Sequence, residues 1–144
     1  MPEHLIFRGG IHPDEYKSLT SASATRPAPL LPLYTVPLQQ HIGAPPKLVV
    51  KKGDRVLRGQ LLAAPGGFVS ATVHSPTSGT VKSIEEVMGP LGALCQAVVV
   101  ESDGLDEADT SLAPIPDWEN TAPDVLKQRI ADAGVAGMGG AAFP

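Results

Sequence analysis

Cysteine, aromatic residues and charged residues are all scarce in this chain of 144 residues, which contains one cysteine, 4% aromatic and 18% charged residues. A single cysteine excludes an intramolecular disulfide and any zinc or iron–sulfur site built from several thiolates of this chain, and it fits a reducing compartment. With 11 basic and 15 acidic residues, the chain lacks the basic surface that nucleic-acid binding needs, so we expect no nucleic-acid partner.

Long apolar runs are also missing. No stretch approaches the roughly 20 residues of a membrane span. The N-terminal sequence MPEHLIFRGG lacks the basic start and the apolar run of a signal peptide. We therefore expect a soluble chain without a membrane span, which can dock on a membrane complex.

Glycine and proline are abundant, with 15 residues each, and this excludes a helical bundle and favours short strands joined by turns. The proline-rich stretch 29–38 cannot be helical, because each proline removes a backbone donor, and it predicts an extended edge strand. Aliphatic runs between turn residues predict further strands at roughly ten-residue spacing, within 48–50, 56–57, 61–63, 68–73, 80–84 and 97–101. The same pattern places glycines in turns and aliphatic side chains in the core: Gly53 and Gly79 in turns, and Val56, Leu61, Val73 and Val81 buried.

Two turn motifs, Gly53-Asp54-x-Val56-x-x-Gly59-Gln60 and Pro76-x-Ser78-Gly79-x-Val81, resemble the two halves of a biotinyl/lipoyl-type barrel-sandwich hybrid. The resemblance implies such a domain over residues 30–102. In the carrier proteins, a lysine between the two turns bears the cofactor. Here the corresponding hairpin, residues 64–68, has no lysine, so a scaffold of the same topology is favoured over a swinging-arm carrier.

Other candidate sites have simpler structural interpretations. Among the histidines, His41 and His74 are expected to bond backbone groups at turns rather than a metal, since no pair has the i,i+4 spacing of a helical metal site. A hydrolase is disfavoured by the absence of a Gly-x-Ser-x-Gly nucleophile elbow. Cys95 is expected to be a buried, inert thiol. The acidic stretch 101–109 is expected to be solvated rather than a calcium loop, and the basic stretch 47–58 a solvated edge rather than a ligand site.

The C-terminal part predicts a linker over residues 103–120 and then one helix, from about Ala122 to Ala133. Thr121 is expected to cap this helix and Gly134 to end it. The following sequence, Gly137-Met138-Gly139-Gly140, places glycines where backbone amides can converge on a phosphate, although a flexible loop is the alternative. Because the chain stops in this loop, we expect it to be part of a longer protein.

Several motifs taken together resemble one family. They follow one another along nearly the whole chain: Gly9-Gly10-Ile11-His12-Pro13, Pro37-Leu38-x-Gln40-His41-Ile42-Gly43-Ala44-Pro45, the Gly53 motif, His74-Ser75-Pro76-Thr77-Ser78-Gly79-Thr80-Val81, and Ala133-Gly134-Val135-x-Gly137-Met138-Gly139-Gly140-Ala141-x-Phe143-Pro144. In this order they resemble the N-terminal portion of proteins of the RnfC family, which are subunits of the Rnf ion-translocating electron-transport complex. The last motif also resembles the flavin-binding loop of the NADH-binding subunit of respiratory complex I.

The resemblance implies an electron-entry subunit on the cytoplasmic side of the bacterial inner membrane, with NAD(H) and the other Rnf subunits as partners. Electrons would pass through FMN and two 4Fe-4S clusters, coupled to sodium or proton movement. The cluster-binding cysteine motifs would lie downstream, and residues 121–144 would begin a truncated α/β nucleotide-binding domain after the N-terminal loop segment 1–29, the β domain and the linker.

Four residues can be carried over from the family's flavin loop: Gly137, Gly139, Gly140 and Phe143. Position 142 is alanine where the family usually has glycine. No catalytic residue or metal ligand is transferred to this chain. We therefore expect this chain by itself to bind no FMN or cluster, and a non-catalytic assembly module remains the alternative function.

Overall fold

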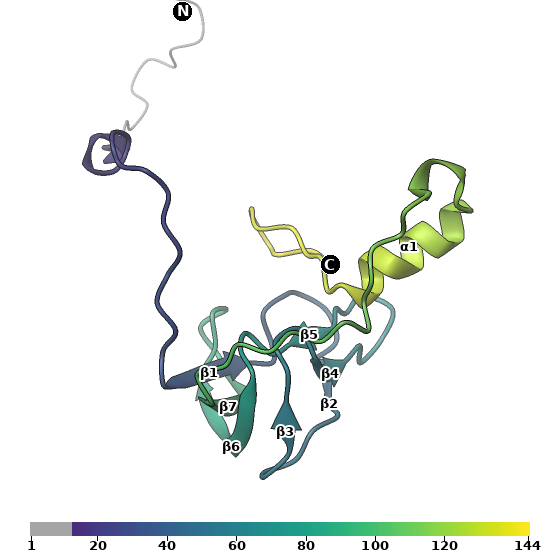
Figure 1. The fold of residues 1–144 in the computed structure, drawn as a ribbon, viewed down its shortest axis with the longest axis horizontal. Coiled ribbons are helices and arrows are strands. Elements are labelled where there is room, and N and C mark those ends of the chain that lie inside the picture. The colour runs from purple at the N-terminus through teal and green to yellow at the C-terminus, as the bar shows by residue number, and fades with distance from the viewer. Residues whose placement is uncertain (1–12) are drawn as a thin grey trace, which may run out of the picture.

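The computed structural model describes residues 13–144, so the start of the predicted N-terminal loop segment, with the motif at residues 9–12, lies outside the described residues. The structure is mainly β, with one α-helix and two short 3-10 helices among the described residues (Figure 1). The elements in chain order are η2 (Lys17–Leu19), β1 (Leu33–Pro37), β2 (Lys47–Leu48), β3 (Arg55–Val56), β4 (Leu61–Ala64), β5 (Val73–His74), β6 (Gly79–Met88), β7 (Leu94–Ser102), η3 (Trp118–Asn120) and α1 (Pro123–Asp132).

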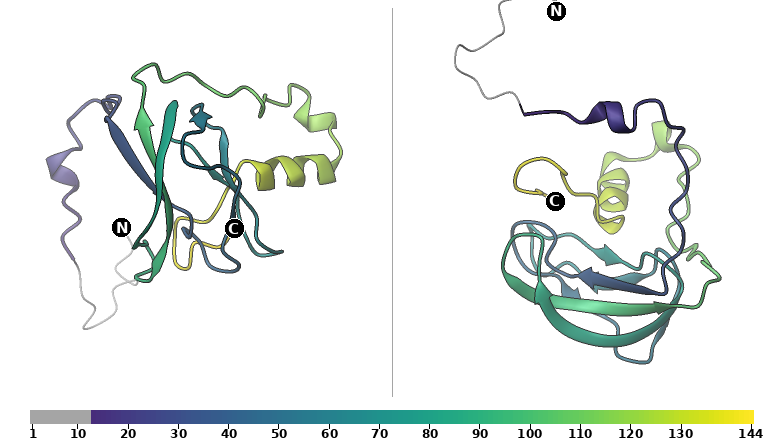
Figure 2. Two further views of the ribbon diagram at one scale, coloured as in Figure 1. Left: turned by 90° about the horizontal axis from the view of Figure 1, so that it is seen from below. Right: turned by 90° about the vertical axis from the view of Figure 1, so that its left-hand side faces the viewer.

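The strands form two antiparallel sheets, which together we call the β domain. One sheet has the order β1-β7-β6-β3, and the other has the order β2-β4-β5. Figure 2 shows the long β6–β7 hairpin curving along one side of this domain, while α1 and the C-terminal loop lie over the other side. The predicted edge strand in the proline-rich stretch is confirmed, because within residues 13–144 β1 pairs with β7 alone and lies at the edge of its sheet.

The core lies between the two sheets and is built from small aliphatic side chains, chiefly valine. Val56, Val73 and Val81 are buried, as predicted. The prediction for Leu61 is wrong: Leu61 is only half-buried, and its neighbour Leu62 is fully buried instead. The cause is a register shift in β4 between Leu61 and Ala63, which turns two consecutive residues toward the core and breaks the simple alternation.

The two predicted glycine turns have different outcomes. Gly53 lies in a turn with φ +90°, and the Asp54 carboxylate accepts a hydrogen bond of 2.9 Å from the Lys51 amide there. Gly79 is instead the first residue of β6, because the turn ends one residue earlier. Its glycine is required by packing, since a Cβ at this position would lie 2.0 Å from the carbonyl oxygen of Glu101 in β7.

The strand predicted over 68–73 is mostly absent, and only Val73 of that stretch lies in a strand, β5. Residues 65–72 form an irregular segment, which begins with Pro65 and two glycines. Its backbone groups bond the loop before β2 instead of a sheet: the Val69 carbonyl accepts the Ala44 amide at 2.9 Å, and the Ala71 amide donates to His41 at 3.0 Å. Side-chain and loop partners therefore replace the ladder that the aliphatic pattern suggested.

The predicted helix is present as α1, but its predicted cap is wrong. Ala122 occupies the N-cap position and Pro123 begins the helix. The Thr121 hydroxyl donates a hydrogen bond of 2.6 Å to the carbonyl of Asp117, just before η3, and so closes that 3-10 turn. At the other end, Gly134 has φ +68°, and the amides of Gly134 and Val135 bond the carbonyls of Ala131 and Ile130. This is the Schellman arrangement that a glycine permits.

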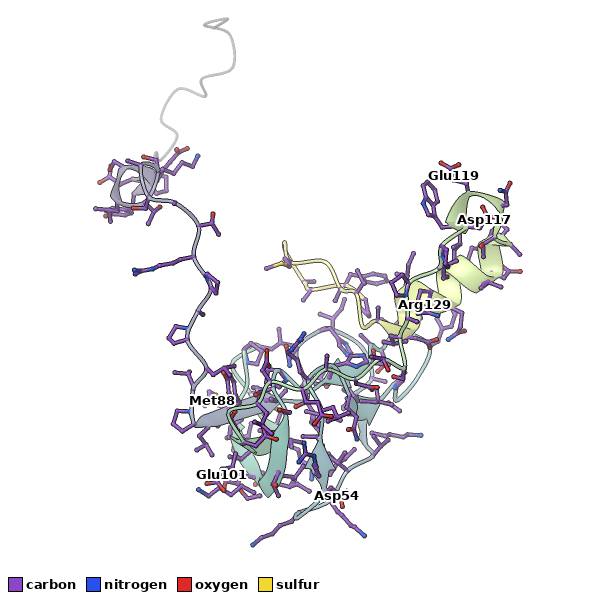
Figure 3. The ribbon with its side chains drawn as sticks, viewed as in Figure 1. Asp54, Met88, Glu101, Asp117, Glu119 and Arg129 are labelled. Carbon is purple, nitrogen blue, oxygen red and sulfur yellow. The ribbon has the colours of Figure 1, made fainter. Side chains whose placement is uncertain are left out.

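The segments on either side of the β domain differ in how they are held. Residues 13–32 are exposed throughout and extend away from the domain (Figure 1). By contrast, α1 is tied to the chain before it, since the guanidinium of Arg129, a residue of α1 (Figure 3), donates to the Ala113 carbonyl. None of the side chains of α1 is fully buried, and among its apolar residues Leu126 is half-buried while Val125 and Ile130 are exposed.

Candidate functional site

The sequence Gly137 to Phe143 forms a closed loop directly after α1, which we call the glycine-rich loop. The Gly137 amide donates to the Phe143 carbonyl at 2.7 Å, which joins the two ends of the loop. Positive φ angles at Gly140 (+62°) and Ala142 (+49°) turn the chain back. The Ala142 carbonyl also accepts the amide of Ile42 at 3.4 Å, so the loop is attached to the β domain.

The four predicted flavin-loop residues are therefore brought together, and they are not equivalent. The Gly137 amide is already used within the loop. The amides of Gly139 and Gly140 find no backbone acceptor among residues 13–144, and a Cβ at either position would meet nothing within 4 Å. Phe143 is 61% exposed. Two consecutive open amides fit one wall of a phosphate site, since such amides bind anions.

A cavity of about 470 Å³ lies between the glycine-rich loop and the β domain. Its walls come from both sides, with residues of the loop and of the chain before it facing residues next to β5: Gly134, Ala136, Gly137, Met138 and Ala142 opposite Gln40, His41, Ala71, Thr72, Val73 and His74. The two histidines that the sequence singled out thus border the same cavity as the glycine-rich loop.

His41 has a structural role within the β domain. It is 2% exposed, and its Nδ1 lies 2.8 Å from the Ile42 carbonyl while its Nε2 lies 3.0 Å from the Ala71 amide. The neutral ring with a proton on Nδ1 satisfies both contacts, because Nδ1 then donates and Nε2 accepts. The predicted bonding of His41 to backbone groups is confirmed.

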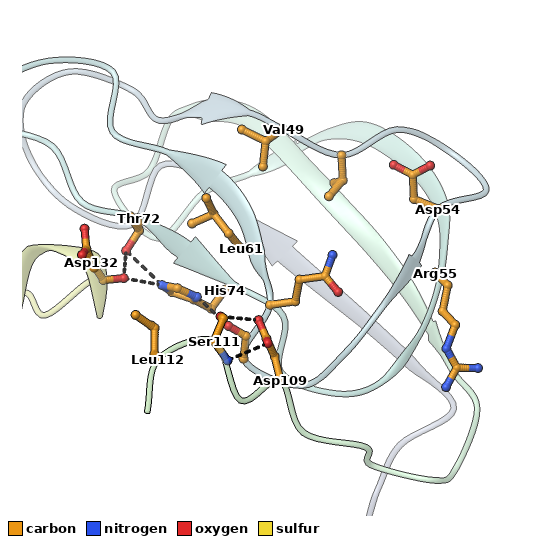
Figure 4. A pocket seen from close by; sticks show the side chains of 13 residues that line it. Val49, Asp54, Arg55, Leu61, Thr72, His74, Asp109, Ser111, Leu112 and Asp132 are labelled. Carbon is orange, nitrogen blue, oxygen red and sulfur yellow. Dashed lines mark hydrogen bonds between the residues drawn. The ribbon is translucent and has the colours of Figure 1, made fainter. Parts of the chain in front are cut away.

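His74 also bonds backbone groups, as predicted, but its two partners belong to different parts of the chain (Figure 4). Its Nδ1 lies 2.7 Å from the Gly59 carbonyl in the β domain, and its Nε2 lies 2.9 Å from the Asp132 carbonyl at the end of α1. The hydroxyl oxygen of Thr72 lies 3.0 Å from Nε2. Both nitrogens can donate to these carbonyls only when the ring carries two protons.

A second cavity, of about 530 Å³, opens on the other side of His74 (Figure 4). Asp109 lines it and accepts hydrogen bonds from the amide and hydroxyl of Ser111, at 2.9 and 2.8 Å. These bonds, together with the nearby His74, hold the pKa of the Asp109 carboxyl below its ordinary value. Because Ser111 bonds Asp109 while His74 faces carbonyls, the three side chains do not form a nucleophilic triad.

The acidic and basic stretches, expected to be separate solvated surfaces, contact each other. Arg55 pairs with Glu107 at 2.7 Å and with Asp103 at 3.4 Å, and Arg58 pairs with Asp106 at 3.1 Å. The side chains remain partly exposed. The contacts hold residues 103–109 along the β domain, and nothing in the local sequence indicated which charges would meet.

The fully buried Ser78 completes this attachment. Its hydroxyl donates to the Asp103 carboxylate at 2.6 Å and accepts the Glu107 amide at 2.9 Å. The hydrogen bonds from Ser78 and from the Leu105 amide, with the charge of Arg55, hold the pKa of Asp103 below its ordinary value.

The described residues offer little to a metal ion. Within residues 13–144, no group of three or more histidine, cysteine, aspartate or glutamate side chains is arranged to hold one. Cys95 is half-buried, not buried as expected, and lies beside Gly89 in the β6–β7 hairpin. A lone thiol does not fit an iron–sulfur cluster.

The helices of residues 13–144 include none that is both long enough and apolar enough to span a membrane.

Comparison with known proteins adds the relatives of this chain. The family model of the RnfC barrel-sandwich-hybrid domain matches residues 5–105. The chain is 42% identical over 138 residues to the C subunit of a proton-translocating ferredoxin:NAD(+) oxidoreductase complex from Clostridium ljungdahlii, covering 96% of this chain and 30% of that protein. It is 41% identical to the C subunit of a Na(+)-translocating ferredoxin:NAD(+) oxidoreductase complex from Acetobacterium woodii, covering 99% of this chain and 32% of that protein.

A third relative is the C subunit of an ion-translocating oxidoreductase complex from Pseudomonas aeruginosa, which is 46% identical over 140 residues. The match covers 96% of this chain and 18% of that protein. This chain thus spans about a third or less of the length of these relatives, and nearly all of its own residues fall within the aligned region.

Proposed function

Because this chain belongs to the RnfC barrel-sandwich-hybrid family, we propose that it forms the N-terminal part of the electron-entry subunit of an ion-translocating ferredoxin:NAD oxidoreductase complex. The observation that carries the proposal is the similarity of 41–46% identity along 95% or more of the chain to proteins named as the C subunits of such complexes. Its partners would be the other subunits of the complex, at the cytoplasmic side of the inner membrane.

The glycine-rich loop is the part of this chain that would meet a cofactor. FMN, when bound to the whole subunit, would supply the chemistry of hydride exchange with NAD(H). The open amides of Gly139 and Gly140 would hold its phosphate, and the exposed ring of Phe143 would offer an apolar contact. Side chains at these glycines would obstruct such a close approach of the backbone.

The remaining cofactors of the subunit would be held elsewhere. Two 4Fe-4S clusters need several thiolates each, and this chain has one cysteine. Residues 121–144 would begin the α/β nucleotide-binding domain, whose other elements would supply the remaining contacts to FMN and NAD(H). A loop that forms only one wall of a site also loses conformational entropy when it is ordered by a ligand, so its own affinity is small.

A non-catalytic assembly module is the second candidate function, and one observation favours it. Several apolar side chains of α1 and the residues after it are more than half exposed, including Val125, Ile130 and Val135. Large apolar side chains exposed close together in the sequence are typical of a contact with another domain or another protein of a complex. The two functions are compatible, since the same part of a protein can both present a loop and dock a partner.

The experiment is an FMN titration of this chain beside the full-length subunit, followed by flavin fluorescence quenching. We expect flavin binding by the full-length subunit and none by this chain. In the full-length subunit, Gly139→Val should release the flavin, because its side chain would stand where the phosphate approaches. Normal flavin content in that variant would remove the loop from the site, and micromolar binding by this chain would contradict the division between loop and downstream domain.

A further inference from the structure

We propose that Thr72 and His74 of the β domain are positioning residues for the glycine-rich loop, because they cap the C-terminal carbonyls of α1 and so set the point from which the loop starts. The proposal rests on the function given above for that loop and adds how the β domain controls it. Neither residue is expected to touch the cofactor.

The last carbonyls of α1 take their hydrogen-bond donors from two sources, the turn that follows the helix and the β domain. The last carbonyls of a helix have no partner within the helix and need donors from elsewhere. The carbonyls of Ile130 and Ala131 receive the amides of the Schellman turn. The carbonyl of Asp132 has no backbone donor among residues 13–144, and its donors come from the β domain.

Two side chains supply those donors. The Thr72 hydroxyl lies 3.1 Å from the Asp132 carbonyl and 3.4 Å from the Ala131 carbonyl, and His74 Nε2 lies 2.9 Å from the Asp132 carbonyl. In Figure 4 both side chains point from the β domain toward Asp132. Donors and positive charge are favoured at the C-terminal end of a helix, where the helix dipole is negative.

At Gly134, the chain after α1 lies close to the backbone of the β domain. A Cβ at this residue would lie 2.5 Å from the Thr72 carbonyl, and its φ is +68°, so a side chain is excluded here by packing and by conformation. The glycine-rich loop begins three residues later. On its far side, the Ala142 carbonyl bonds the Ile42 amide. The β domain therefore holds the loop both before and after its open amides.

The hydrogen bonds that His74 can make depend on how many protons its ring carries. Its other nitrogen faces the Gly59 carbonyl, so the ring links the two carbonyls by hydrogen bonds only as an imidazolium. The ionisable side chains that line the cavities on either side of the ring are Asp54, Arg55, Asp109, Asp132 and His41. Protonation would therefore tighten the attachment of α1, and loss of the second proton would weaken it.

The test measures hydrogen–deuterium exchange in this chain for two variants of one residue. Thr72→Val keeps the shape of the side chain but removes the donor, whereas Thr72→Ser keeps the donor. We expect the amides of residues 133–137 to exchange roughly fivefold faster in Thr72→Val, the factor expected for loss of one hydrogen bond, and at the original rate in Thr72→Ser. Unchanged exchange in β6 and β7 would show that the β domain is intact.

The contribution of His74 is tested by its pH dependence, which a merely structural side chain would not produce. After correction for intrinsic exchange, residues 133–137 should be better protected at about pH 5.5 than at about pH 8, because only a ring with two protons can donate to both carbonyls. In His74→Gln the side-chain amide keeps an N–H donor for the Asp132 carbonyl but does not ionise, so the difference between the two pH values should disappear.

The outcomes separate this proposal from the function of the loop. If Thr72→Val leaves the exchange of residues 133–137 unchanged, or if His74→Gln keeps the pH difference, the positioning role is overturned, whatever the flavin content of the full-length subunit. If both exchange results are obtained, the full-length Thr72→Val variant should also bind FMN several-fold more weakly than the full-length Thr72→Ser variant. Equal FMN affinity in the two variants would overturn the link between the attachment and the cofactor.

Discussion

Gly79 is the residue at which the packing of the β domain is least tolerant of a side chain. A Cβ there would lie 2.0 Å from the backbone oxygen of Glu101, and a backbone atom in a central strand pair cannot move aside. We expect Gly79→Ala to lower the free energy of unfolding by about 2 kcal/mol, the scale of overpacking in a filled interior. Urea denaturation measures this. Gly139→Ala is the control, since its Cβ would meet nothing within 4 Å, and an equal loss in both variants would contradict the steric argument.

Asp103 makes the attachment of residues 103–109 sensitive to acid. Its pKa is held below the ordinary value of 3.8 by the Ser78 hydroxyl, the Leu105 amide and Arg55. A lowered pKa means that the carboxylate is favoured by the folded state, so its contribution is present above about pH 4 and is lost as the pH falls through 3.8 toward the lowered value. We expect the Glu107 amide to lose its exchange protection over this range. In Asp103→Asn, protection should already be reduced at neutral pH, and an unchanged acid transition in that variant would contradict this assignment.

At the scale of single elements, α1 shows how a correct helix can carry an incorrect cap. Since the Thr121 hydroxyl bonds the exposed Asp117 carbonyl and not an amide of α1, Thr121→Ala should change the stability of the helix by less than about 0.5 kcal/mol, against about 1 kcal/mol for a true N-cap. Exchange of the α1 amides measures this. Gly134→Ala is the contrasting variant and should loosen the end of the helix, because its Cβ would meet the Thr72 carbonyl. A loss at Thr121→Ala as large as that of a true cap would show that Thr121 caps α1 after all.

The elements that local sequence predicted are those whose signals are local. Prolines restrict the backbone around β1 to an extended conformation, the turn at Gly53 separates two strands, and Gly134 ends the helix. The failures depend on distant partners. The stretch before β5 became irregular because His41 and Ala44, about 25 to 30 residues away, bond its backbone, as the contacts with Val69 and Ala71 show.

In the candidate site, too, the features with local signals were predicted and the contacts between distant residues were not. The glycine spacing alone placed the loop after the helix, and the structure brings its four residues together. The contacts of Thr72 and His74 with Asp132 join residues 58 to 60 positions apart, and no spacing rule reveals such a pair. Their local signal was a histidine next to a turn, which indicated a backbone partner without identifying it.

At the scale of the whole molecule, the β domain belongs to a barrel-sandwich-hybrid family, and its turn motifs resemble those of cofactor carriers, but it lacks the lysine that bears the cofactor in them. The loop between β4 and β5, where carriers have their lysine, has Phe68 fully exposed instead. Lys51, Lys52 and Lys82 lie elsewhere in the sequence. We expect the intact mass of protein co-expressed with a biotin ligase to be that of the unmodified chain, with an authentic biotin carrier domain modified in parallel. A biotin-sized increase in mass would contradict the interpretation of the domain as a scaffold.

The position of β1 has a consequence for encounters between copies of this molecule. The carbonyl of Pro32 and the amide of Leu38 bond β7. Because backbone groups alternate in direction along an antiparallel strand, those of Leu33, Thr35 and Pro37 point away from β7, toward the edge that pairs with no other strand within residues 13–144. An open edge is a template on which another chain can add a strand and begin to aggregate. Pro37 has no N–H to offer at that edge, and the chain on both sides of β1 is interrupted by further prolines. The same prolines that identify an edge strand in the sequence thus interrupt the row of N–H donors that a second molecule would need to pair with β1. They therefore disfavour edge-to-edge association of these molecules at high concentration.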